Sequence, residues 1–102
     1  MTTLIGKRLA QARKRVGLSQ KELGIKAGID AFAASPRINQ YERGKHTPDF
    51  DTATRLAKVL KIPPAYFYTK DNRLAEIILL YGAFSVKDRQ KGLELFKKLI
   101  KN

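Results

Sequence analysis

The stretch Gly17-Leu18-Ser19-Gln20-Lys21-Glu22-Leu23 contains the end of one helix and the start of the next. Gly17 can adopt the left-handed backbone conformation that commonly follows the last residue of a helix. Ser19 and Glu22 have the spacing of a capping box, in which the hydroxyl accepts from a backbone N–H and the carboxylate bonds back to the cap. The stretch therefore predicts a tight turn, followed by a helix that begins at Ser19 and ends at Gly28.

Upstream of this turn, the spacing of apolar residues predicts a first helix over residues 4–16. The apolar stripe of this helix, at intervals of three and four residues, consists of Ile5, Leu9, Ala12 and Val16. Basic residues on its other faces are Lys7, Arg8, Lys14 and Arg15. This pattern is typical of a helix that packs one side against a core.

Downstream, the segment Ile38-Asn39-Gln40-Tyr41-Glu42-Arg43-Gly44-Lys45 predicts a third helix that Gly44 ends. We expect Ser35 to be its N-cap and Pro36 its first residue, where the missing N–H costs nothing. Ile38 and Tyr41 should pack inward, which leaves polar residues on the other faces. Residues 29–35 have no clear pattern, although Asp30 could cap one further short turn.

The rest of the chain also has helical spacing, and no segment alternates long enough to predict a sheet. Asp49 is expected to cap a fourth helix with the apolar face Phe50, Ala53, Leu56, Ala57 and Leu60. A short helix is expected at residues 65–68, a longer one at 72–81, and a last one that Ser85 caps and that reaches Ile100. The expected fold class is therefore all-α.

The chain is strongly basic, with 21 Lys and Arg against 9 Asp and Glu and a formal net charge of +12. Residues 1–70 hold 14 basic and 5 acidic side chains, and residues 71–102 hold 7 and 4. This excess indicates a polyanionic partner, of which nucleic acid is the commonest for a soluble protein. An anionic membrane surface, or charge that serves solubility alone, are the weaker interpretations.

Several functional classes have no support in the sequence. The chain has no Cys, and its one His, His46, has neither a Cys nor a second His with which to bind a metal ion. We therefore expect no metal site. Clustered carboxylates, a His pair and a glycine-rich phosphate loop are missing, so we expect neither an enzyme nor a cofactor. The N-terminal segment lacks an apolar signal core, and the apolar run 77–81 is too short to cross a bilayer. We therefore expect a protein of the reducing cytoplasm.

The third helix has the composition of one that reads bases in a DNA major groove. Arg can bridge guanine O6 and N7, and Asn or Gln can bridge adenine N6 and N7. The residues that we expect to contact bases are Ser35, Arg37, Asn39 and Gln40. The start of the preceding helix, with Ser19, Gln20 and Lys21, should lie at the phosphate backbone, because free N–H groups there favour an anion.

Residues 4–68 resemble the Cro/cI-type (Xre family) helix-turn-helix domain of phage and bacterial repressors. The resemblance rests on 13–18, 19–23, Ala27-Gly28, 38–45, Pro48 and 56–62, which follow one another in the family's order. It implies a five-helix, lambda-repressor-like DNA-binding domain over residues 1–70, followed by a two-helix extension over 71–102. It also implies an operator-binding homodimer.

The resemblance also assigns roles to individual residues. It implies that Gln20 touches the DNA backbone and braces the third helix, and that Arg13 and Glu42 form an internal ion pair. Phosphate contacts are implied for Arg43, Lys45 and His46. The segment 29–40, which separates Ala27-Gly28 from Tyr41-Glu42, is longer than in most members of the family. The extra residues fall in the turn or at the tip of the third helix, so that Phe32 either packs on the second helix or lies exposed near DNA.

The helix expected at 72–81 is apolar on more than one side, through Leu74, Ile77, Ile78, Leu79, Leu80 and Tyr81. We expect it to contribute to a homodimer interface with the last helix packed against it; the alternative is that the last helix covers it within one chain. The leading functional hypothesis is a transcriptional repressor. An antitoxin that binds its toxin through residues 71–102, or a restriction-modification controller, would use the same DNA-binding domain.

Overall fold

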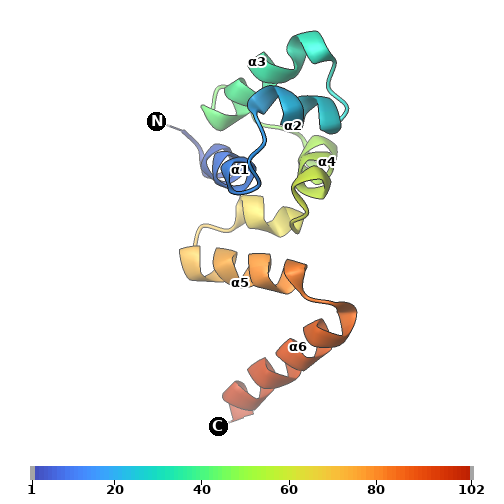
Figure 1. Ribbon diagram of the computed structural model, residues 1–102. Helices are drawn as coiled ribbons and strands as arrows, with labels where there is room; N and C mark the ends of the chain where they lie inside the picture. Colours follow the sequence, from blue (N-terminus) through green and yellow to red (C-terminus); the bar gives the residue numbers. More distant parts are fainter. Residues whose placement is uncertain (1, 102) are drawn as a thin grey trace.

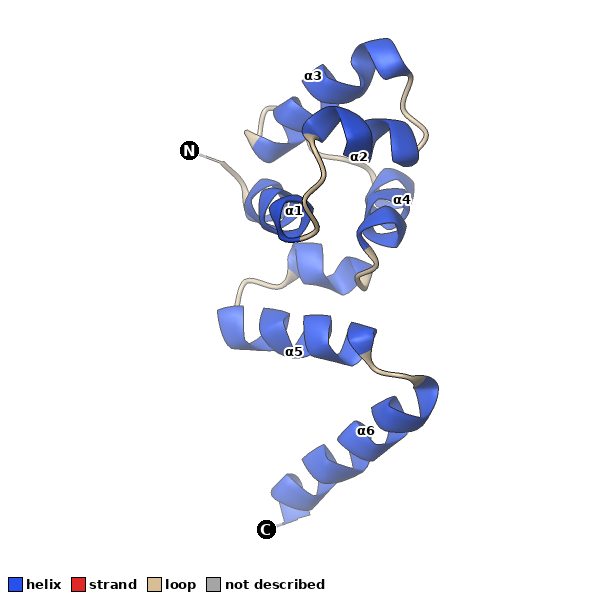
Figure 2. Cartoon of the chain, viewed as in Figure 1, coloured by secondary structure: helices blue, strands red, loops and turns tan. Residues whose placement is uncertain are grey.

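The computed structural model describes residues 2–101, and this part of the chain is helical throughout, with no strand (Figures 1 and 2). In chain order the elements are α1 (Leu4–Arg15), α2 (Gln20–Lys26), α3 (Ala31–Glu42), α4 (Phe50–Leu60), the 3-10 helix η1 (Pro64–Tyr68), α5 (Asn72–Ala83) and α6 (Val86–Lys101). The all-α fold class is confirmed. None of the helices in the described part has the length and apolar character needed to cross a membrane.

The predicted helix boundaries around α2 are confirmed in detail. The Ser19 hydroxyl accepts from the Glu22 N–H at 3.0 Å, and the Ser19 N–H donates to the Glu22 carboxylate at 2.8 Å, which completes the capping box. Gly17 and Gly28 have φ values of 76° and 92°, in the left-handed region where glycine has no steric cost. The local chemistry of single residues therefore sets where α1 ends and where α2 begins and ends.

Acidification is expected to weaken two of these caps. Hydrogen bonds from backbone N–H groups lower the pKa of Glu22, at the Ser19 cap, and of Asp49, which accepts from the Thr52 N–H at 2.8 Å. A lowered folded-state pKa means stability that is present above the ordinary carboxyl range and is lost as pH falls through the folded-state value. We expect the free energy of unfolding to decrease below about pH 4.

Urea denaturation between pH 7 and pH 3 measures this dependence. Glu22→Gln and Asp49→Asn are expected to reduce the slope, because each removes one of the titrating caps. Glu76→Gln, at an exposed position in the middle of α5, is the matched control for the loss of one carboxylate outside a helix cap. A slope that neither cap variant changes would contradict this account of the acid sensitivity.

The start of α3 differs from the prediction. The helix begins at Ala31 rather than after Ser35, and Asp30 is its cap, accepting from the Phe32 N–H at 3.1 Å. Pro36 lies inside the helix, where it removes the one hydrogen bond that its N–H would have given to the Phe32 carbonyl. Alanine has the highest helix propensity, and the Ala-rich turn 31–34 offsets this loss. The extra residues of the chain therefore lengthen α3 instead of the turn before it.

Close packing between α2 and α3 holds this added turn in place. Ala34 is fully buried, and a Cβ at Gly24 would lie 2.7 Å from the Ala34 Cβ, so only glycine permits this approach. The core beneath is formed by the elements from α1 to η1, with Ala75 added from α5. Its largest fully buried side chains are Leu9, Leu23, Ile38, Leu56, Leu60 and Phe67. The predicted inward positions of Ile38 and Tyr41 are confirmed.

Three predictions of side-chain burial were wrong. Val16 and Phe50, both assigned to apolar faces, are 43% and 67% exposed, because one follows the last turn of α1 and the other is the first residue of α4. Arg8, assigned to an outer face, is 4% exposed. Its guanidinium donates to the carbonyls of Thr69 and Lys70, at 3.0 and 3.1 Å, which belong to the joint before α5.

This arginine helps to attach α5 to the rest of the domain. Arg8 also donates to the Asn72 side chain at 2.9 Å, at the first residue of α5. At the other end of α5, a Cβ on Gly82 would come within 2.6 Å of Pro63, and Ala75 between them joins the core. The helix α5 is therefore fixed to the preceding helices along its length.

The last helix does not pack along α5, which corrects the prediction. Figure 1 shows α6 leaving the end of α5 at an angle and extending away from the rest of the protein. No residue of α6 is buried, and Leu80 and Tyr81 of α5 remain 54% and 48% exposed. An apolar cleft of about 190 Å³ lies where the two helices meet. The alternative in which α6 covers α5 within one chain is therefore wrong.

Candidate nucleic-acid interface

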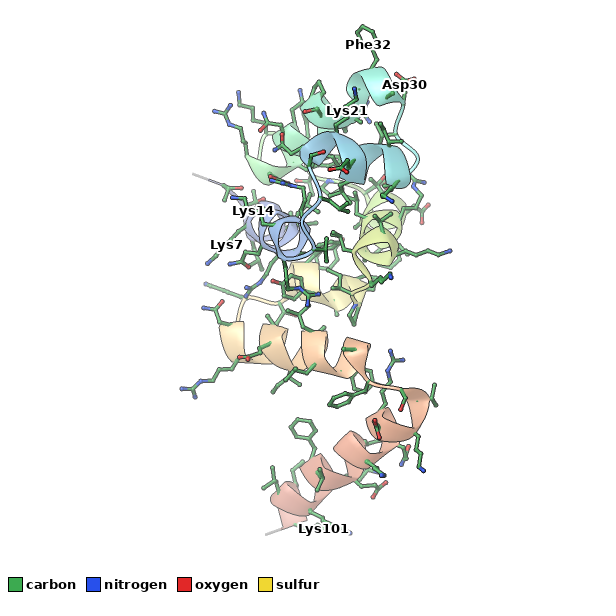
Figure 3. The ribbon with its side chains drawn as sticks, viewed as in Figure 1. Lys7, Lys14, Lys21, Asp30, Phe32 and Lys101 are labelled. Atoms are coloured by element: carbon green, nitrogen blue, oxygen red, sulfur yellow. The ribbon has the colours of Figure 1, made fainter. Side chains whose placement is uncertain are left out.

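The side of α3 that faces away from the core carries a row of four residues. Ala34, Ile38 and Tyr41 are buried on the inner side. Residues 32, 36, 39 and 43, at intervals of three and four, lie opposite them. We call this row the α3 outer face: Phe32, Pro36, Asn39 and Arg43. Figure 3 shows Phe32 at the outer end of the helix, pointing away from the protein.

A hydrogen-bond network fixes Asn39 in this face. The Gln20 side-chain amide of α2 donates to the Asn39 side-chain oxygen at 3.3 Å and to the Glu42 carboxylate at 3.1 Å. Because the Asn39 oxygen accepts from Gln20, its NH₂ group is the end that can donate to a base. Gln20 thus braces α3, in the manner that the family resemblance implied.

The same network contains the ion pair between Arg13 and Glu42. Arg13 Nε and Nη2 donate to the two carboxylate oxygens at 2.6 and 2.9 Å, and Nη1 donates to the Leu18 carbonyl at 3.0 Å. Both side chains are about nine-tenths buried, and the hydrogen bond to Glu42 raises the pKa of Arg13. This bidentate geometry makes the pair stronger than a single charge-assisted hydrogen bond. It connects α1 to α3, while the Leu18 contact secures the turn before α2.

The other predicted base-contacting residues lie on the flanks of α3. Arg37 and Gln40 line a hollow of about 400 Å³ together with His46 and Thr47 of the following loop. This arrangement brings two predicted base-contacting residues close to a predicted phosphate-contacting one. Ser35 is half-buried in the middle of the helix and lies outside this group.

The predicted phosphate-contacting residues lie at the ends of α2 and α3. Lys21 is exposed in the first turn of α2, next to Ser19, whose hydroxyl is used in the cap. Arg43 and Lys45 are exposed at the end of α3, on either side of Gly44. These exposed basic residues could contact phosphates, which would position α3 for the residues that could read bases.

The sequence alone left Phe32 either against α2 or exposed near DNA, and it did not place Phe32 on one face with Pro36 and Asn39. Phe32 was placed before the expected start of α3, and so shared no helix face with Asn39. The available signal was Asp30 followed by an alanine-rich turn, because Asp is a strong N-cap and alanine favours the helix. A start at Ala31 gives the row of four directly.

Comparison with known proteins agrees with this geometry. A helix-turn-helix family profile matches residues 9–67. The HTH-type transcriptional regulator ImmR of Bacillus subtilis (strain 168) is 34% identical over 67 residues, which span 66% of this chain and half of ImmR. The crystal structure of the transcriptional regulator BswR superposes with a TM-score of 0.88 at 40% identity, over 99% of this chain and 97% of that one. The chain belongs to the helix-turn-helix family of DNA-binding transcriptional regulators, as its resemblance to Cro/cI-type (Xre) proteins predicted.

Proposed function

We propose that the protein binds a two-fold DNA operator as a homodimer and represses transcription from the cytoplasm. The observation that carries the proposal is the braced outer face of α3, with Asn39 oriented by Gln20 and exposed basic residues at the start of α2 and the end of α3. In this arrangement α3 enters the major groove, and α2 lies across the backbone. The protein acts by binding rather than by catalysis, and repression needs only that it occupies a site that polymerase must use.

The homodimer is supported by the apolar surface of α5 and α6. Large apolar side chains that are exposed there are Leu74, Ile77, Leu80, Tyr81, Phe84, Val86, Leu93, Leu95, Phe96, Leu99 and Ile100. A monomer rarely leaves so many on one part of its surface, and such patches mark protein interfaces. Two copies related by a two-fold axis would present two α3 helices to half-sites about 34–36 Å apart.

Gln40→Ala and Lys45→Ala are expected to affect DNA binding in different ways. Gln40 lies beside the outer face of α3 and is expected to contact a base, so its loss should relax the preference at one position of each half-site. A good bidentate contact contributes roughly 1–3 kcal/mol of discrimination. Lys45 is expected to contact a phosphate, so its loss should weaken binding to all DNA sequences alike. The slope of log K against log salt concentration should become shallower by about one unit.

The test starts with the selection of binding sites from random duplex DNA at a fixed salt concentration. Affinities of wild type and both variants for the selected operator and for scrambled DNA are then measured from low to high salt. Lys87→Ala, on the exposed side of α6, is the matched control for the loss of one positive charge. Variants that bind operator and scrambled DNA as wild type does would refute the assigned interface.

A further inference from the structure

Phe32 is the most exposed large apolar side chain in the described part of the protein, at 94%. Phenylalanine is among the residues most often buried in proteins, and here its ring supports no part of the core. The backbone beneath it is nevertheless well fixed, because Asp30 caps the helix at the Phe32 N–H and Ala34 packs on Gly24. The fold thus presents an apolar side chain to solvent from a fixed backbone position.

The location of Phe32 relates it to DNA rather than to the dimer surface. Phe32 is the first residue of the α3 outer face, in line with Asn39 and Arg43. Figure 3 shows it at the end of the protein opposite α5 and α6. The added turn 31–34 extends the helix by about 6 Å beyond Ser35 at 1.5 Å per residue. In the proposed complex, this extension carries the ring along the major groove past the bases that Asn39 and Gln40 reach.

The chemistry of the ring restricts what it can contact there. A phenyl group neither donates nor accepts a conventional hydrogen bond, and the apolar group that base edges offer in the major groove is the C5-methyl of thymine. Asp30, two residues before Phe32, is an acidic residue that disfavours a phosphate at this end of α3. A base edge therefore fits this position better than the backbone does.

We propose that Phe32 is a specificity-determining residue that packs against the C5-methyl group of a thymine in each half-site. This inference rests on the proposed function, because it requires α3 to lie in the major groove. It assigns a role in sequence choice to the additional turn of α3. Burial of one methyl-sized group is worth about 0.8 kcal/mol, which corresponds to about fourfold in affinity per half-site.

The experiment replaces each thymine of the selected operator, one symmetric pair at a time, with deoxyuridine, which lacks only the methyl group. Dissociation constants are measured at one salt concentration for wild type and Phe32→Ala. At one pair, deoxyuridine is expected to weaken wild type by about 15-fold over two half-sites, and to leave Phe32→Ala unaffected. Asn39→Ala should keep the full effect of the methyl group.

Ile25→Ala removes an exposed apolar side chain of α2 outside the α3 outer face and is the matched control. Thermal unfolding should show that Phe32→Ala is as stable as wild type, because the ring is outside the core. Equal responses of wild type and Phe32→Ala at every deoxyuridine pair would overturn the inference and leave DNA binding standing. A loss of affinity in Phe32→Ala that is the same for operator and scrambled DNA would overturn it too. Such a loss would indicate that the ring contacts the sugar rather than a base. A wild-type protein that selects no duplex would refute the proposed function, and this inference with it.

Discussion

Leu99→Asp is expected to convert the proposed homodimer to monomers and to weaken operator binding by at least about 100-fold, because two linked DNA contacts become independent ones. Leu99 is 72% exposed, and α6 has no buried residue, so the substitution leaves the fold of the single chain intact. In the dimer, each copy would lose the burial of one leucine, roughly 1.5–3 kcal/mol, and would bury a carboxylate without a partner.

Light scattering and sedimentation over a range of protein concentrations measure the oligomeric state. The affinities for DNA with one half-site and for DNA with two half-sites measure how strongly the two DNA contacts are coupled. Lys91→Gln, on the polar side of α6, lowers the net charge by one unit as Leu99→Asp does, and should remain dimeric with wild-type affinity. Thermal unfolding at low protein concentration separates loss of the dimer from loss of the fold. If wild type is itself monomeric at micromolar concentration, the homodimer is wrong and the apolar surface belongs to a different protein, as the antitoxin hypothesis requires.

Glu42→Ala is expected to destabilise the protein by roughly 3–5 kcal/mol, because it leaves the buried guanidinium of Arg13 without its partner. For a chain of this size, such a loss lowers the melting temperature by more than about 10 °C. The substitution also removes one of the two acceptors of Gln20, so the orientation of Asn39 should become less well defined. Operator discrimination is therefore expected to decrease even at temperatures where the variant is folded.

Glu94→Ala provides the matched control, since Glu94 pairs with Lys97 at 3.7 Å while both side chains are more than half exposed. An exposed pair contributes little, so this variant should lie within about 0.5 kcal/mol of wild type in urea denaturation. The double variant Arg13→Met, Glu42→Leu should recover much of the lost stability, because no unpaired charge stays buried. Similar stabilities for Glu42→Ala and Glu94→Ala would show that the Arg13–Glu42 pair is not structural.

The predictions from sequence were most successful where contacts between residues close in the chain determine the local structure. The capping box of Ser19 and Glu22, the cap at Asp49 and the glycines after α1, α2 and α3 set helix boundaries through contacts within a few residues. The family assignment followed from the order of such motifs along the chain. The start of α3 was missed because Ser35-Pro36 is itself a good local start signal, and it competes with Asp30.

The amino-acid sequence by itself determined the helical content, the positions of most helix ends and the membership of the helix-turn-helix family, because these depend on interactions between residues close in the chain. The tertiary structure alone decided that Ala34 packs on Gly24 and so places Phe32 on the α3 outer face, that Arg8 is buried at the start of α5, and that α6 leaves its apolar side exposed. These features depend on residues distant in the chain, whose approach is governed by the shape of the packed core rather than by any local pattern.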